Sequence, residues 1–142
     1  MKEDGSTLYT RCGNTFRSST IRAQDMVYSG RLSLSQDVHS YLITSLSQSD
    51  AAKEILVVEE DSYACSWPGN PLNCYMHVAI YESEFQNRLA LYSIPPVVVS
   101  GTAYVQRGLF VFHSADGTSR FMLSRLHGMP NMATEYYLTT LQ

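Results

Sequence analysis

The chain has 142 residues, the length of a single domain, and its composition already excludes several classes of protein. Hydrophobic residues make up 44% and charged residues 16%, which excludes a collagen, a coiled coil, an acidic disordered tail and a disulfide-dense toxin. The net charge of −3 is too acidic for a general nucleic-acid-binding protein. We expect residues 1–24 to form a polar, flexible arm and residues 25–142 to form a single α+β domain.

The charges are distributed unevenly along the chain. Residues 1–36 carry five basic and three acidic residues, residues 37–87 carry one and eight, and residues 88–142 carry four and two. The net charges of these segments are therefore +2, −7 and +2. An acidic middle between basic flanks suits head-to-tail self-association, but one solvated acidic loop would give the same distribution.

The first elements predicted in the chain are a strand and a helix. Apolar residues alternate with polar ones over 26–34, which predicts a half-buried strand. Ser35 can cap a helix whose first turn contains Asp37, a position where a carboxylate meets the positive end of the helix dipole. Apolar residues at spacings of i, i+3, i+4 and i+8 predict about three turns of this helix. They are Val38, Tyr41, Leu42 and Leu46.

The middle of the chain predicts strands joined by turns. Residues 55–58 predict a strand that ends at the acidic residues 59–61, and residues 62–73 have the composition of a loop. Residues 75–81 and 89–94 predict two further strands, the second of which is ended by Pro95 and Pro96.

The last third of the chain predicts a strand, a hairpin and a helix. Residues 97–105 predict a strand with a bulge at Ser100 and Gly101. Residues 109–113 and 120–123 flank a turn sequence and predict a hairpin, and residues 131–142 predict a terminal helix. The predicted fold is α+β, with mainly antiparallel sheet or a partly open barrel and one main helix packed on it.

Known catalytic motifs do not occur in the sequence. It has no phosphate loop, no dinucleotide-binding glycine motif, no nucleophile elbow and no metalloprotease helix motif. His113 lies three residues before Asp116, a spacing more typical of a turn cap than of an acid–base pair. We therefore predict a protein that is not an enzyme, with no catalytic residue and no cofactor.

Two cysteines and a histidine form the most suggestive cluster for metal binding. Cys65, Cys74 and His77 could hold zinc if Cys12 or His39 supplied a fourth ligand, but the spacing matches no familiar zinc motif. A disulfide between Cys65 and Cys74 is a second interpretation, and two free thiols are the one that we favour. We predict no metal site.

The sequence also bears on location. No run of about 18 apolar residues is present, which predicts no transmembrane segment. The polar first ten residues lack the apolar stretch of a signal peptide. Together with an odd number of cysteines and no glycosylation sequon, these features predict an intracellular protein.

Residues 108–117 followed by 121–127 resemble the C-terminal hairpin of rhabdovirus matrix proteins. The 26–34 segment, running into the predicted helix, is similar to the first strand and helix of that family, and residues 78–82 are similar to another of its strands. The resemblance implies a protein in the host cytoplasm or the virion that self-associates and contacts the nucleoprotein and an anionic membrane surface. The family's lysine-rich arm is reduced here to scattered arginines, and Val98 replaces the tyrosine of its Pro-Pro-x-Tyr motif.

Our leading hypothesis is a non-catalytic, self-associating structural protein. The resemblance extends this hypothesis to a viral protein of the matrix type. In this hypothesis, exposed arginines contact an acidic segment of a neighbouring chain, and Trp67 is either a loop anchor for a partner or a lid on the core. The arginines are Arg11, Arg17 and Arg22, and the acidic residues are Glu59, Glu60 and Asp61. The alternatives are a small-ligand pocket in a partly open barrel and an acidic inhibitor or immunity-type protein.

Overall fold

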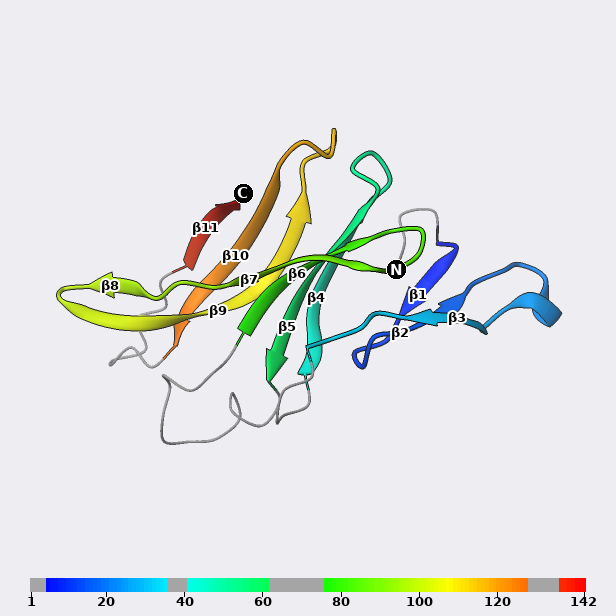
Figure 1. Ribbon diagram of the computed structural model, residues 1–142, viewed down its shortest axis with the longest axis horizontal. Helices are drawn as coiled ribbons and strands as arrows, with labels where there is room; N and C mark the ends of the chain where they lie inside the picture. Colours follow the sequence, from blue (N-terminus) through cyan, green and yellow to red (C-terminus); the bar gives the residue numbers. More distant parts are fainter. Residues whose placement is uncertain (1–4, 36–40, 62–75, 128–135) are drawn as a thin grey trace.

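The computed structural model describes residues 5–35, 41–61, 76–127 and 136–142, whose regular secondary structure is almost exclusively antiparallel β-strand (Figure 1). Strands contain 64% of them and a helical conformation 3%, in three sheets with one half-barrel. No helix of seven or more residues occurs in these four ranges. The predicted α+β class is therefore wrong, because the one main helix that it required is replaced by sheet.

The N-terminal sheet has three strands in the order β1-β2-β3. They are β1 (Thr7–Tyr9), β2 (Asn14–Arg17) and β3 (Val27–Arg31), with one 3-10 turn, η1 (Arg22–Gln24), between the last two. Strand structure thus begins within the segment predicted to be a flexible arm. Of the half-buried strand predicted over 26–34, residues 27–31 form β3, which is mostly exposed, and the buried Leu32 and Leu34 follow it.

The central sheet has four strands in the order β4-β5-β6-β7. They are β4 (Tyr41–Ser49), β5 (Glu54–Asp61), β6 (Met76–Glu82) and β7 (Arg88–Ser93). All eight residues of β5 are buried. A strand covered on both faces has a continuous apolar run rather than an alternating one, which accounts for residues 55–58.

The C-terminal sheet has the order β11-β10-β9-β8. Its strands are β8 (Val97–Val99), β9 (Thr102–His113), β10 (Arg120–His127) and β11 (Tyr136–Leu141). Ser100 and Gly101 both have positive φ angles, of 49° and 81°, so they form a tight turn between two strands and not a bulge within one. The predicted hairpin is confirmed, with Arg120 paired to His113.

The helix predicted after Ser35 is replaced by strand β4 over the residues that the structure describes. Tyr41 and Ile43 are buried and belong to the core, whereas Thr44 is exposed. A register shift between Ile43 and Ser45 disturbs the alternation, so the apolar spacing imitates a helix. Aromatic and β-branched residues favour a strand here, and the serines do not favour a helix. Residues 36–40, with Val38, lie outside the described ranges.

The predicted terminal helix is also wrong for residues 136–141, which form β11 and pair with β10 along its whole length. Tyr136, Leu138 and Thr140 are exposed and alternate with half-buried residues, which is the period-two pattern of a strand. The rest of that prediction, residues 131–135, lies outside the described ranges.

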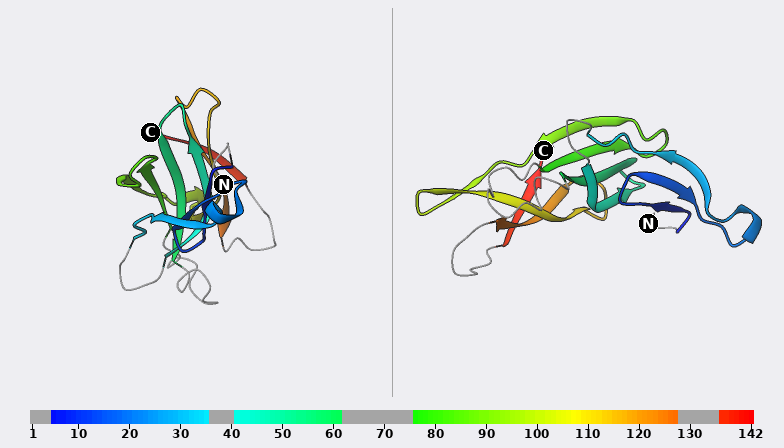
Figure 2. Two further views of the ribbon diagram at one scale, coloured as in Figure 1. Left: turned by 90° about the vertical axis from the view of Figure 1, so that its right-hand side faces the viewer. Right: turned by 90° about the horizontal axis from the view of Figure 1, so that it is seen from below.

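The central sheet lies between two apolar clusters. On one face, Ile55 and Val57 pack with Leu32 and Leu34, which follow β3. On the other face, Leu56, Val58, Val78 and Ile80 pack with Val111 and Met122 of the C-terminal sheet. The N-terminal sheet and the β8–β9 turn lie at opposite ends of the long axis (Figures 1 and 2).

Candidate interaction surface

The outer face of strands β9, β10 and β11 carries large apolar side chains that nothing else in the described structure covers. Directly paired residues in antiparallel strands share a face. Phe112 pairs with Phe121, and their rings stack with centroids 5.4 Å apart. Phe110 pairs with Leu123, which in turn pairs with Leu138. These two rows therefore lie side by side on one surface, which we call the outer face.

The exposure of these side chains sets the outer face apart from the core. Phe110 is 59% exposed and Leu138 is 64% exposed, while Phe112 and Tyr136 are also exposed. Val111, between the two phenylalanines in sequence, is buried against the central sheet. The pairing of β9 with β10 shifts register between Leu123 and Ser124, and the residue opposite Ser124 is Gly108. Because Gly108 has no side chain, the C-terminal sheet can approach the central sheet closely on its inner side.

The outer face contains almost no charge. Strands β9, β10 and β11 contain three arginines and no aspartate or glutamate. Arg107 and Arg120 are engaged by carboxylates of β5, and Arg125 pairs in the ladder with Tyr136. A surface of this composition matches an apolar partner better than a charged one.

The acidic residues predicted to contact a neighbouring chain lie inside the fold. Glu59 and Asp61 are fully buried, and Glu60 is buried with its carboxylate held by two nitrogens of Arg107, at 2.7 Å and 3.3 Å. Glu54, at the other end of β5, binds Arg120 in the same way. Both pairs join the central sheet to the C-terminal sheet, so this placement does not favour an intermolecular role for these acids.

Glu59 is held on the opposite face of the central sheet by uncharged donors. Its Oε2 accepts a hydrogen bond from the Ser35 amide at 2.9 Å, and its Oε1 lies 2.5 Å from the Tyr81 hydroxyl. Burial and the bond to Glu59 raise the pKa of Tyr81 well above its ordinary value, so this hydroxyl keeps its proton. The contact fixes the segment after β3 onto the central sheet.

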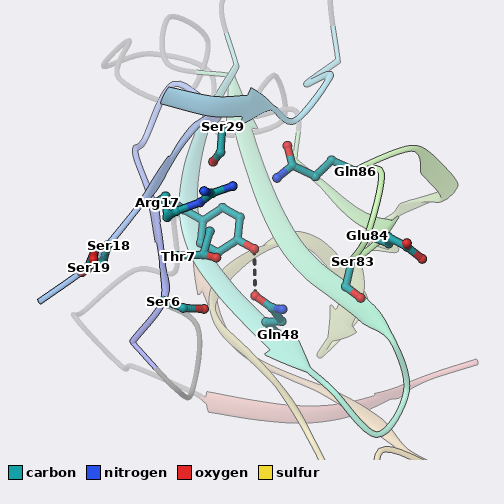
Figure 3. Close-up of a pocket in the computed structure, with 11 residues that line it drawn as sticks. Ser6, Thr7, Arg17, Ser18, Ser19, Ser29, Gln48, Ser83, Glu84 and Gln86 are labelled. Carbon is teal, nitrogen blue, oxygen red and sulfur yellow. Dashed lines mark hydrogen bonds between the residues drawn. The ribbon is translucent and has the colours of Figure 1, made fainter. Parts of the chain in front are cut away.

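The predicted arginines are exposed on the N-terminal sheet and its connections. Arg11 lies between β1 and β2, Arg17 ends β2, and Arg22 begins η1. Of the three, Arg17 lines a polar hollow between the N-terminal and central sheets, together with Gln48 and Gln86 (Figure 3). Trp67, Cys65 and Cys74 lie outside the described ranges.

The described residues offer no site for a metal. No group of three or more histidine, cysteine, aspartate or glutamate side chains is suitably placed among them. His77, the part of the predicted cluster that is described, has its Nε2 atom 3.3 Å from the Tyr41 hydroxyl and packs against that ring. This contact makes His77 part of the packing between β4 and β6.

Ser47 and His113 form the one serine–histidine contact that the described residues contain, with Oγ and Nδ1 3.0 Å apart. The contact borders a hollow of about 390 Å³. The other ring nitrogen of His113 is buried and has no hydrogen-bond partner in the described part of the chain, so no acid orients the ring as a catalytic triad requires. The amide of His113 also donates to Ser47, and we interpret the contact as a link between β4 and β9.

Comparison with known proteins gives no relative from which a function can be transferred: no protein family, curated protein or solved structure matches the chain. None of the helical structure within the described ranges has the length and apolar character needed to cross a membrane. The outer face was not predicted from the sequence. Its signal is the run Leu109-Phe110-Val111-Phe112, in which both faces of a strand are apolar although only one is covered.

Proposed function

We propose that this protein is a non-catalytic, self-associating structural protein that uses the outer face of β9, β10 and β11 as its contact surface. The observation that carries the proposal is the set of exposed side chains on this face, led by Phe110 and Leu138. Soluble monomers seldom expose a contiguous apolar patch beyond a few hundred Å², and larger patches mark interaction sites.

The extent of the outer face is suited to a second copy of the chain. Its four exposed large apolar side chains are Phe110, Phe112, Tyr136 and Leu138, and they contribute roughly 100 Å² each. With the half-buried Phe121 and Leu123 and the polar rim, the face approaches the ~600–800 Å² per partner of a small stable interface.

Charge also favours a second copy as the occupant. A strongly basic partner would lose hydration on this face and gain no ion pair, because β9, β10 and β11 contain no acidic residue, and an acidic partner would find there one arginine without a carboxylate partner in the described structure, Arg125. An identical sheet face offers the same apolar side chains, and two sheets pack face to face at about 10 Å with their side chains interdigitated. The resemblance to rhabdovirus matrix proteins stays a prediction, and this proposal does not depend on it.

The experiment is light scattering over a range of protein concentration and salt. We expect a mass that grows with concentration and is not reduced by added sodium chloride, because apolar contacts are not screened. Mass that falls with added salt would support instead an association mediated by Arg11, Arg17 and Arg22. A monomer under all conditions would contradict the proposal.

A matched pair of variants tests the surface itself. Leu138→Ser on β11 should weaken self-association about tenfold, because a leucine contact of this kind is worth about 1.4 kcal/mol. Leu89→Ser on β7 is the control, since this leucine is 62% exposed against 64% for Leu138 and also lies in an edge strand. Equal effects of the two substitutions would exclude the outer face as the specific contact surface.

A further inference from the structure

A second surface, unrelated to the outer face, has the character of a ligand pocket. It is a hollow of about 450 Å³ between the N-terminal sheet, strand β4 and the turn that joins β6 to β7 (Figure 3). This volume is within the range of small-molecule sites in proteins. The eleven described residues that line it are all polar: seven carry hydroxyls, two carry amides, and two are charged.

Hydrogen bonds hold parts of the pocket wall in place without a ligand. The Tyr9 hydroxyl of β1 donates to Oε1 of Gln48 on β4 at 2.8 Å. The Gln86 side chain donates to the buried Thr15 hydroxyl at 3.2 Å, and the Ser29 hydroxyl donates to the same oxygen at 3.3 Å. The first two bonds tie the N-terminal sheet to the central sheet and its β6–β7 turn, and the third joins two strands of the N-terminal sheet. Together they pre-organise the wall and lower the cost of ordering it on binding.

The charge inside the pocket comes from Arg17. In Figure 3 its guanidinium group extends into the hollow toward Gln86, whereas the Glu84 carboxylate points away from the centre. In the described part of the chain, Arg17 makes no ion pair, unlike Arg107 and Arg120. A guanidinium group presents several donors in one plane, which matches the two oxygens of a carboxylate or phosphate.

We propose that this pocket binds a polyhydroxylated small molecule with one anionic group, that is, an acidic sugar whose charge is a carboxylate or a phosphate. The hydroxyl and amide groups of the wall can both donate and accept, as a ligand rich in hydroxyls requires. An apolar ligand would gain little from the polar wall. Arg17 binds the anionic group, and Gln48 and the serine hydroxyls contact the hydroxyls of the ligand.

The test is a titration of the full chain in which binding is measured by changes in amide chemical shifts. The four probes are glucuronate, glucose 6-phosphate, glucose and inorganic phosphate. We expect at least one of the two acidic sugars to bind at least tenfold more tightly than glucose and than inorganic phosphate. The tighter acidic sugar identifies the anionic group. Shifts should cluster at residues 6–9, 17–19, 29, 48 and 83–86.

Variants then connect the binding to the pocket. Arg17→Gln should reduce the affinity for the preferred acidic sugar at least tenfold, while Arg22→Gln, which removes the same charge outside the pocket, should leave it unchanged. Both positions are exposed, so both variants should keep the thermal midpoint of the parent. Binding of neither acidic sugar, equal binding of inorganic phosphate, or equal losses in the two variants would each overturn the proposal.

Discussion

The two faces of the C-terminal sheet are both apolar, but only one of them is covered. On the inner face, Val111 and Met122 pack against Leu56 and Val58 of the central sheet. On the outer face, Phe110 on the same strand as Val111 remains 59% exposed. The comparison shows that apolar character alone does not separate residues that stabilise the monomer from residues that are available to a partner. The two kinds of residue differ in whether another sheet of the same chain covers them.

We expect the largest difference in stability between the two faces when Met122, on the inner face, is truncated. Met122→Ala should lower the free energy of unfolding by about 2–5 kcal/mol, because it leaves a cavity between two sheets. Leu138→Ala on the outer face should change it by no more than about 0.5 kcal/mol. Urea denaturation at concentrations where the protein is monomeric measures both. Similar losses at the two positions would show that the outer face is also covered within the monomer.

The ion pairs at the margins of the inner face help to hold the C-terminal sheet against the central sheet. A substitution of Arg120 tests this contribution. Arg120→Met should cost about 2–3 kcal/mol, because it leaves the Glu54 carboxylate buried without its partner. The cost falls short of the ~3–5 kcal/mol of a fully buried pair because the Arg120 side chain is 30% exposed.

Arg125→Met is the matched control for this ion pair, since Arg125 lies on the same strand and forms no ion pair in the described part of the chain. It should be nearly neutral. The double variant Glu54→Leu/Arg120→Met should recover most of the stability that Arg120→Met loses, because no buried charge then remains unpaired. Failure to recover would mean that Arg120 acts by packing and not by its charge.

The smallest expected effect is a pH dependence of the free energy of unfolding that arises from His113, on the inner side of β9. Burial lowers the pKa of His113 below its ordinary value of 6.5, and Arg120 lowers it further, against an opposing effect of Glu54. The unfolded chain then binds more protons than the folded chain as the pH falls through 6.5, so stability should decrease there and level off below the folded-state pKa.

Urea titrations between pH 5 and pH 8 measure this dependence in the parent and in His113→Gln. The difference between the two proteins isolates His113 from the other titrating groups. Self-association through the outer face should not follow the same curve. If the free energy of unfolding changes with pH by the same slope in both proteins, His113 is not the source of the pH dependence.

Much of the sheet could be predicted from the sequence because its signals are local. The hairpin of β9 and β10 follows from turn residues between two apolar runs, and β5 and β6 follow from continuous apolar segments. The helix prediction failed because Tyr41, Leu42 and Leu46 fit a helical period by coincidence, across a strand with a shifted register. Period alone cannot separate these cases in a short segment.

The candidate sites depended on long-range contacts and were harder to predict. Glu54 and Glu60 have the sequence signature of a solvated acidic edge, but their partners lie 66 and 47 residues further along the chain. The exposure of Phe110 was hidden for the same reason, since nothing local says which face of a two-sided apolar strand is covered. The charge of Arg17 predicts a contact residue from the sequence alone, but its place in a polar pocket depends on β4 and the β6–β7 turn.

The strand order has a consequence for biosynthesis. Each sheet consists of strands that are consecutive along the chain, so the ribosome releases each sheet as one uninterrupted block. The last residue of the central sheet, Ser93, is made before any residue of β8, β9 or β10. At typical rates of translation, Arg120 follows Ser93 by roughly 1–5 s. During that interval one face of the central sheet, with its two carboxylates, is exposed on the nascent chain, and this is the stage at which a chaperone would have the most to protect.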